Sequence, residues 1–329
     1  MATKGLPRPK ALNLSKSELL KSLAALDECI EAQKRVRQME DDFRKRIATH
    51  LTSLAKVAQK PFRDYNTNPF VLLFYSSQQK FTRVDEIESV LVPAKVFSSM
   101  ETSAGRMVER VVLPPYGWGC VDSGMHTIDS VVDGSKLDGD TLRIVTLKSG
   151  PRCINDSMTG DIARELVDNA PAWAKKAKVK KVEFTVGVLY GTRKKSNKKD
   201  WHILRRACEI VTERANRSTS VLESPADQWQ CRLKIKGIEV TARVELGESL
   251  WSLVGSGHDA FTELLCAAVR SCIDPSNPSK KNVKSQIPDL GKITELTAAQ
   301  KKMNFTILQK SQVEWFLLMA AHFAEGFTE

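Results

Sequence analysis

The sequence lacks the features that mark several common classes of protein. Its seven cysteines are odd in number, widely scattered and free of any CxxC pair, which argues against both a disulfide framework and a zinc site. No apolar run approaches the roughly 20 residues of a membrane-spanning helix, and the N-terminus has no apolar signal-peptide core. We therefore expect a soluble protein of a reducing, cytoplasmic compartment, with no membrane partner.

Glycine loops of the kind that bind nucleotides are missing as well, and so are internal repeats. The stretch GSGHDA at 255–260 lacks the Lys and the Ser or Thr that complete a phosphate-binding loop. A glycine-rich turn before a helix explains this stretch better. We therefore expect no nucleotide cofactor.

The chain carries a net positive charge. Its 329 residues carry 50 Lys and Arg against 39 Asp and Glu, a formal net charge of +11, and 42% hydrophobic residues suffice for an ordinary core. Between residues 175 and 206, twelve basic side chains stand against only Glu183 and Asp200. Such a tract favours a polyanionic partner such as nucleic acid, whose phosphates it would neutralise. The alternative is a solubilising loop.

The N-terminal part of the chain has a helical pattern. From Leu14 to about Lys60, apolar residues recur at spacings of three and four, which predicts one long helix or two in succession, capped by Ser15 or Ser17. The other face is densely charged with near-balanced signs, which is typical of a solvated face; the alternative is a dimerisation or DNA-clamping arm. So narrow an apolar stripe needs a packing partner, and a second copy of the chain is a natural candidate.

The remaining pattern alternates helices and strands. We expect a buried segment at NPFVLLFY, separate helices at 84–97 and 100–112, a helix from Asn155 or Asp156 to about Ala177 that Pro171 interrupts, and a helix at 201–215. VKKVEFTVGVLYG reads as a central strand, and 230–244 as a hairpin that turns at Gly237. A linker at 274–291 precedes an apolar C-terminal helix, expected to pack on the N-terminal helix or a partner subunit.

The stretch HTIDSVVDGSKLDGDTLRIVTLKSGPRCIND, residues 126–156, combines a carboxylate, a turn and a lysine. We expect a short strand that ends near Asp129, a turn over 133–140, and a second strand, TLRIVTLK, that ends at Lys148. Adjacent antiparallel strands would bring Asp129 close to the end of the second strand. Carboxylates and a main-chain carbonyl there could hold Mg²⁺, and the lysine could reach a phosphate, an arrangement that suits a metal-dependent phosphodiesterase.

The other acidic residues near this stretch have simpler explanations. The turn residues Asp133, Asp138 and Asp140 do not have calcium-loop spacing, and we interpret them as ordinary turn chemistry. Glu109, on the helix at 100–112, has neighbouring arginines at positions 106 and 110, so an ion pair on the helix surface accounts for it without any catalytic role.

Several short segments occur in an order that is informative when they are taken together: Asn68 to Phe70, RMVERVVLP at 106–114, TID at 127–129, TLKSG at 146–150, TVGVLYG at 185–191 and WHILRR at 201–206. With this order, the region from about 65 to 255 resembles the type II restriction endonucleases of the PD-(D/E)xK superfamily, in particular those that cut interrupted palindromes of the GGNCC kind. The resemblance implies an α/β fold with a restriction-endonuclease-like mixed β-sheet core flanked by helices.

The resemblance also implies roles for individual residues. Asp129 would bind Mg²⁺, and Lys148 would orient the attacking water and steady the phosphate. The second acidic position of the motif holds Thr146, a departure from the superfamily pattern, beside the carbonyl oxygen of Leu147. Either Glu109 replaces the missing metal ligand, or Asp140 bends in from the turn, or catalysis is weakened. We favour Glu109, because Asp140 lies about 20 Å from Thr146 along an extended strand.

A bacterial, cytoplasmic endonuclease that acts on double-stranded DNA as a homodimer is the function that the resemblance implies. The alternative is a protein of the same fold that binds DNA without cutting it. DNA contacts are expected from two groups of polar residues, around the motif lysine and in the loop TRKKSNKKD: Ser149, Arg152, Asn155, Arg193, Lys194, Lys195, Lys198 and Lys199. The expected organisation is a dimerisation region at 1–64, a catalytic domain at 65–273, a linker at 274–291 and a C-terminal helix at 292–329.

Overall fold

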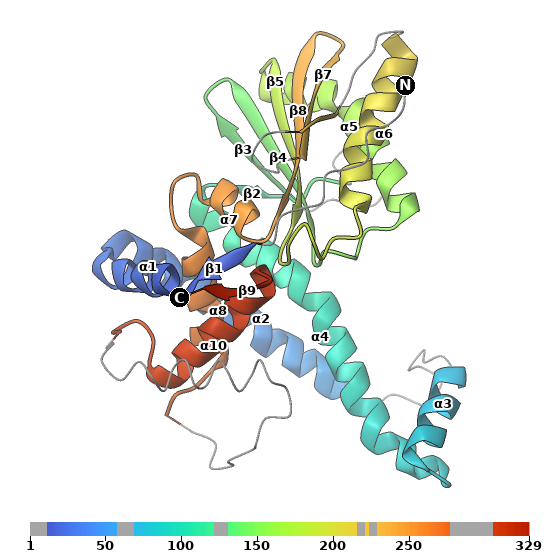
Figure 1. The fold of residues 1–329 in the computed structure, drawn as a ribbon, viewed down its shortest axis with the longest axis vertical. Coiled ribbons are helices and arrows are strands. Elements are labelled where there is room, and N and C mark those ends of the chain that lie inside the picture. Colours follow the sequence, from blue (N-terminus) through green and yellow to red (C-terminus); the bar gives the residue numbers. More distant parts are fainter. Residues whose placement is uncertain are drawn as a thin grey trace.

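A mixed β-sheet forms the upper part of the protein in Figure 1. The computed structural model describes residues 12–57, 69–121, 131–215, 221–223, 229–276 and 305–328. Within them a seven-stranded sheet has the order β2 (Gly119–Cys120), β3 (Gly134–Asp138), β4 (Thr141–Lys148), β5 (Lys181–Val188), β8 (Ile238–Leu246), β7 (Trp229–Ile235) and β6 (Val221–Glu223). The mixed sheet with flanking helices confirms the predicted fold class.

The three central strands, β4, β5 and β8, run parallel, and the outer pairs are antiparallel. β5 lies in the middle, as its continuous apolar sequence predicts. Its neighbours match it residue for residue, so that Lys148 of β4 lies beside Val188 and Leu246 of β8 lies on the other side. The carboxyl ends of these three strands therefore meet at one edge of the sheet.

Two helices cover one face of the sheet. α5 (Asp156–Ala177) and α6 (Lys199–Ala215) pack on residues such as Ile144 and Phe184, and Trp173 of α5 stacks on the Phe184 ring at 6.0 Å. Asn155 caps α5 by accepting from the Met158 N–H, one of the two predicted caps. The expected interruption at Pro171 is wrong: α5 continues through it, because the buried residues on both sides offset the hydrogen bond that proline cannot make.

On the other face of the sheet, one short helix contacts the strands directly. α7 (Glu248–Gly255) lies directly on the strands: a Cβ on Gly187 would come within 2.7 Å of Leu147 and Leu250 side-chain atoms, so only glycine admits this packing. Beyond it, α8 (Ala260–Cys272) joins α1 (Lys16–Glu28), α2 (Ile30–Val57) and α10 (Lys310–Ala320) in one apolar core. None of the helices in the described part of the chain is long and apolar enough to cross a membrane.

The N-terminal helices find their packing partner within the chain. The predicted pattern breaks into two helices at Cys29, and Ser15 caps the first by accepting from the Glu18 N–H. The apolar stripe of α2 then packs along α8. A second copy of the chain is therefore not needed to cover this stripe. The C-terminal helix, α10, packs into the same core, but it is shorter than the helix expected over 292–329. Residues 305–309 are not helical, and Gly326–Thr328 forms strand β9, which pairs with β1 (Asn13–Ser15). The start of the expected linker, 274–276, is described, and 277–304 lies outside the described residues.

Three further predictions are corrected by the structure. The two helices expected at 84–97 and 100–112 are one helix, α4 (Glu88–Val112), which continues through Pro93. The turn expected over 133–140 is mostly strand β3, and only Gly139 and Asp140 turn. The segment NPFVLLFY is an exposed helix, α3 (Pro69–Gln79), instead of a buried one. Its composition predicts burial but does not identify what would cover it.

The hairpin expected at 230–244 is confirmed. β7 and β8 pair antiparallel, and their two-residue turn consists of Lys236 (φ 48°) and Gly237 (φ 85°). Positive φ at both turn residues matches the right-handed twist of the flanking strands.

A buried ion pair connects the N-terminal helices to the rest of the core. Arg35 of α2 donates two hydrogen bonds, of 2.7 and 2.6 Å, to the Glu263 carboxylate of α8. The Tyr116 hydroxyl, after the end of α4, donates to the same carboxylate at 2.7 Å. The Glu263 side chain is 2% exposed, so each of its partners offsets the cost of burying a charge.

Replacement of Arg35 should therefore destabilise the protein strongly. We expect Arg35→Ala to lower the free energy of unfolding by about 3–5 kcal/mol, because the Glu263 carboxylate is left buried with one partner. Urea denaturation measures this change. The matched control is Arg205→Ala, which breaks an exposed i,i+4 pair with Glu209 and should cost less than about 1 kcal/mol. Equal effects of the two substitutions would show that the buried pair has no special role.

Candidate active site

Asp133 lies where β3 begins, next to the end of β4. Its backbone N–H donates to the Val145 carbonyl at 2.9 Å, and its carboxylate oxygen Oδ2 accepts from the Leu147 N–H at 2.6 Å. The buried Thr146 hydroxyl donates to the same oxygen at 3.4 Å. These bonds hold the Asp133 carboxylate beside the strand segment that leads to Lys148.

Helix α4 brings a second carboxylate, Glu109, to the same place. The residue after the helix, Leu113, packs against Gly134, where a Cβ would come within 2.6 Å of the leucine Cδ1. Lys136 of β3 adds a second link, because its ammonium donates to the Tyr116 carbonyl at 2.9 Å. The last turn of α4 is thereby fixed against the start of β3, and Glu109 lies within electrostatic reach of Asp133.

The electrostatics of Glu109 show how closely these groups gather. Its pKa is raised from 4.5 to about 7, first by burial and then by the negative charge of Asp133. The positive charges of Lys148, Arg106 and Arg110 oppose the rise. Glu109 is therefore not explained as one half of a simple ion pair on the helix surface. Burial and the neighbouring carboxylate raise its pKa more than its two arginines lower it.

Lys148 is the last residue of β4 and is half-buried. Its carbonyl accepts from the Leu189 N–H at 2.9 Å, which ties this end of β4 to the end of β5. The preceding residue, Leu147, directs its N–H to Asp133. In an antiparallel pair the N–H and C=O of one residue point to the same side of the strand, so the Leu147 carbonyl also faces the Asp133 side.

These groups have the chemistry of a site for a hard divalent cation. Glu109 and Asp133 offer carboxylate oxygens, and Leu147 a carbonyl oxygen. In the described part of the chain no three His, Cys, Asp or Glu side chains are grouped for a metal. Mg²⁺ keeps several waters and is commonly held by one or two carboxylates. Burial and, after it, the charge of Asp133 raise the Glu109 pKa, and a divalent cation between the two carboxylates would offset both, so the residues present fit Mg²⁺.

The sequence-predicted site residues are only partly brought together. Glu109, Thr146, Leu147 and Lys148 gather at one end of β4, whereas Asp129 lies outside the described residues. The suggestion that Asp140 bends in is wrong, because Asp140 lies at the other end of β4 and pairs with Lys181 at 2.7 Å.

Asp133 is the residue that sequence reasoning missed. Asp138 of the same segment pairs with Arg143 at 2.9 Å, so turn and hairpin chemistry does explain that residue. For Asp133 the interpretation as a turn residue is wrong, since its carboxylate faces Leu147. The available signal was the apolar pair Val131–Val132 directly before it and the glycine directly after it, which suit the start of a strand as well as a turn.

The basic loop lies at the same end of the sheet as Lys148, as expected. It follows β5, and it is joined to the segment after β4 by hydrogen bonds from the Asn197 N–H to the Pro151 carbonyl and from the Asn197 side chain to the Ile154 carbonyl. The two groups of predicted DNA-contacting residues therefore form one surface beside the candidate active site.

Several basic side chains of this loop have partners within the protein. Arg193 lies over the Trp229 ring at 4.3 Å and donates to the Val244 carbonyl. The ammonium of Lys195 donates to the Ala324 carbonyl, and that of Lys199 pairs with Asp156. These contacts hold the loop against the body of the protein.

Five of the predicted DNA-contacting residues remain exposed at this surface: Ser149, Arg152, Asn155, Lys194 and Lys198. Of these, Asn155 is engaged as the cap of α5. Arg152 makes one long bond, of 3.3 Å, to the Lys195 carbonyl. Among the contacts of the described residues, no hydrogen bond or ion pair engages the ammonium groups of Lys194 and Lys198. These are the cations best placed to meet a phosphate.

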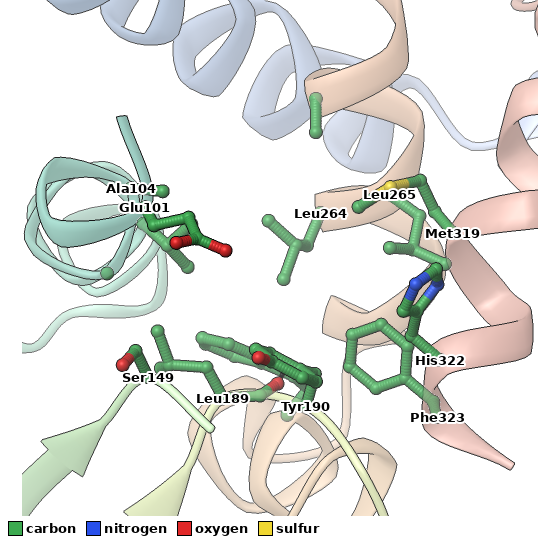
Figure 2. A pocket seen from close by; sticks show the side chains of 14 residues that line it. Glu101, Ala104, Ser149, Leu189, Tyr190, Leu264, Leu265, Met319, His322 and Phe323 are labelled. Atoms are coloured by element: carbon green, nitrogen blue, oxygen red, sulfur yellow. Dashed lines mark hydrogen bonds between the residues drawn. The ribbon is translucent and has the colours of Figure 1, made fainter. Parts of the chain in front are cut away.

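A largely apolar cavity of about 580 Å³ lies beside the site, between α4, α8 and α10. Figure 2 shows Glu101 and Ala104 on one wall, Leu264, Leu265 and Met319 on another, and Ser149 and Tyr190 along the lower edge. Ser149 is the residue after Lys148, so the cavity borders the candidate site. Its lining does not include Glu109, Asp133 or Lys148, and it is therefore separate from the charged groups.

Comparison with known proteins identifies one family. The family model described as type II restriction endonuclease EcoO109I matches residues 31–211, which is more than half of the 329 residues. The matched region runs from α2 to α6 and contains Glu109, Asp133 and Lys148. No curated protein matches the chain.

The charge of Glu109 should make the stability of the metal-free protein depend on pH. Because its pKa is about 7 in the folded protein and 4.5 for an ordinary glutamate, folding is opposed increasingly as pH rises from 4.5 to 7, and the penalty is complete above that range. Glu109→Gln removes the penalty, so we expect a higher melting temperature than wild type at pH 8 and an equal one near pH 4. Thermal denaturation in EDTA measures this difference.

The matched control is Glu101→Gln, an exposed carboxylate on the same helix. It should shift the melting temperature little at either pH. A stabilisation by Glu109→Gln that is the same at pH 4 and pH 8 would contradict the assigned environment.

Proposed function

Because the chain belongs to the type II restriction endonuclease family of EcoO109I, we propose that it is a Mg²⁺-dependent homodimer that cuts double-stranded DNA at a palindromic site. Membership of the family makes it a site-specific DNA endonuclease. The cation, the dimer and the palindrome, which the sequence resemblance suggests is an interrupted one of the GGNCC kind, are part of the proposal. The convergence of Glu109, Asp133 and Lys148 at one end of β4 is the observation that carries it.

The proposed metal ligands are the carboxylates of Asp133 and Glu109 and the carbonyl of Leu147. When bound there, Mg²⁺ would lower the pKa of the attacking water and neutralise charge on the scissile phosphate. Asp133 takes the role that the sequence resemblance gave to Asp129. The Leu147 N–H and the Thr146 hydroxyl hold the Asp133 carboxylate in place. Thr146 thus acts by positioning, and Glu109 supplies the negative charge that a threonine cannot.

Lys148 is the proposed cation of the reaction. Its ammonium can donate to the attacking water or to a phosphate oxygen, and it offsets the negative charge that develops as the phosphodiester is attacked. Its half-buried position strengthens this interaction relative to bulk water. Lys194, Lys198, Arg152 and Ser149 extend the same surface and would contact the DNA backbone or the bases.

Lys148→Ala tests the catalytic role. Incubation of the wild-type protein with plasmid DNA and Mg²⁺ should give discrete fragments. Lys148→Ala should lower the rate of cleavage by about 10²–10³-fold or more, the effect of losing one group that stabilises developing charge. DNA binding with Ca²⁺, measured by gel shift, should change little. Near-normal cutting by this variant would refute the assigned site.

Separate substitutions of Asp129 and Asp133 show which of the two aspartates is the metal ligand. In the same assay Asp133→Asn should abolish cutting, while Asp129→Asn and the matched control Asp138→Asn should cut normally. An inactive Asp129→Asn beside an active Asp133→Asn would return the ligand role to Asp129. Wild-type protein that retains plasmid DNA without cutting it, whichever of Mg²⁺, Mn²⁺ or Co²⁺ is added, would support instead a non-cleaving DNA-binding protein, with Thr146 marking the lost activity.

A further inference from the structure

Helix α3 and the first half of α4 form an arm that extends away from the sheet (Figure 1). A short 3₁₀ helix, Val84–Ile87, lies between them. The arm exposes a group of large apolar side chains, here named the arm patch: Phe70, Val71, Leu73, Phe74, Val84, Phe97 and Met100. Phe74 is 71% exposed and Phe97 is 65% exposed. Elsewhere on the described chain such side chains are more scattered.

The composition of α3 is not that of a helix that faces water. Its sequence, PFVLLFYSSQQ, contains no charged residue, and apolar residues occur all round it, which is typical of a buried helix. A helix of 11 residues is also too short to be stable in water by itself, since isolated helices need about 12–15 residues. In the described part of the chain, α3 packs extensively on no other element. Most of α3 therefore stays exposed within the described part of the chain.

We propose that the arm patch binds the arm patch of a second copy of this chain, related by a two-fold axis. The proposal deepens the homodimer of the proposed function and rests on it. Nucleic acid does not suit the patch, because its own seven side chains are all apolar and offer no charge to a phosphate. The apolar stripes of α1, α2 and α10 are covered within the chain, which leaves the arm patch as the large apolar surface available for dimerisation.

The size of the arm patch fits a dimer interface. A large aromatic side chain can bury about 150–250 Å², so three phenylalanines about two-thirds exposed would contribute about 300–500 Å². The four aliphatic side chains add a comparable area, giving roughly 700 Å², close to the about 800 Å² per partner of a stable interface. Monomeric proteins rarely expose continuous apolar patches of more than a few hundred Å². Two identical patches also satisfy two-fold symmetry, in which each copy offers the same surface.

This dimer would connect the interface directly to catalysis. Phe97 of the arm patch and Glu109 of the candidate site are on one continuous helix, α4, about 18 Å apart at 1.5 Å per residue. The two-fold contact between arms would therefore set the separation of the two active sites, one for each strand of a palindromic duplex. In a monomer each site would cut without its partner.

Phe74→Asp tests the interface, because a charge in the centre of an apolar contact strongly disfavours association. We expect sedimentation velocity to show that wild-type protein is a dimer and that Phe74→Asp has half its mass. The matched control is Leu137→Asp, which introduces the same charge at an isolated apolar residue, 58% exposed on β3, and should remain a dimer. Circular dichroism should show that all three proteins keep their overall fold, apart from a small loss of helix in Phe74→Asp, where α3 loses its partner.

The outcomes separate this inference from the proposed endonuclease activity. A monomeric wild type, or a Phe74→Asp variant that stays a dimer, would overturn the inference whether or not the protein cuts DNA. Loss of the dimer in both variants would also overturn it, since the effect would not be specific to the arm. A wild-type dimer that dissociates only with Phe74→Asp would support it even if no cutting is seen. With cutting, the monomer should convert plasmid mainly to nicked circles.

Discussion

The close packing of α4 against the start of β3 is the constraint on which the candidate site depends. Because residue 134 is glycine, Leu113 lies directly against the strand, and the last turn of the helix delivers Glu109 to Asp133. Burial raises the Glu109 pKa most, and the negative charge of Asp133 raises it further. Packing of helix and sheet thus holds together groups that would separate in water, with Lys148 as a partial counter-charge. This is the state in which a divalent cation binds most favourably.

The sheet on one side and the helical core on the other hold this contact in place. The parallel strands β4 and β5 end together, so that Lys148 and the basic loop share one edge of the sheet. The buried carboxylate of Glu263 binds Arg35 and Tyr116, which joins the N-terminal helices to the residue that follows α4. The same helix runs outward to the arm patch. In this arrangement α4 would connect DNA cleavage at one end to dimerisation at the other.

The sequence predicted the elements whose patterns are determined locally. β4 was predicted from its alternating side chains, β5 from its continuous apolar sequence, and the β7–β8 hairpin from its turn residues. The position of Lys148 could be predicted because it is the last residue of β4. β3 was not found, because its polar sequence GSKLD has the composition of a turn and becomes a strand only by pairing with β4. The role of Asp133 was missed for the same reason. The exposure of α3 could not be predicted either, since apolar residues indicate burial without naming the partner.

The central claim is that Glu109, Asp133 and Leu147 surround one metal site, and metal-directed cleavage of the polypeptide tests it most directly. Fe²⁺ takes the place of Mg²⁺, and hydroxyl radicals generated with ascorbate and peroxide cut the backbone close to the bound ion. Mass spectrometry then locates the cuts. We predict three groups of cuts, near residues 109, 133 and 147, which Mg²⁺ suppresses and Asp133→Asn abolishes. Cuts confined to the turn at residues 138–140, or a pattern unchanged in Asp133→Asn, would contradict the account.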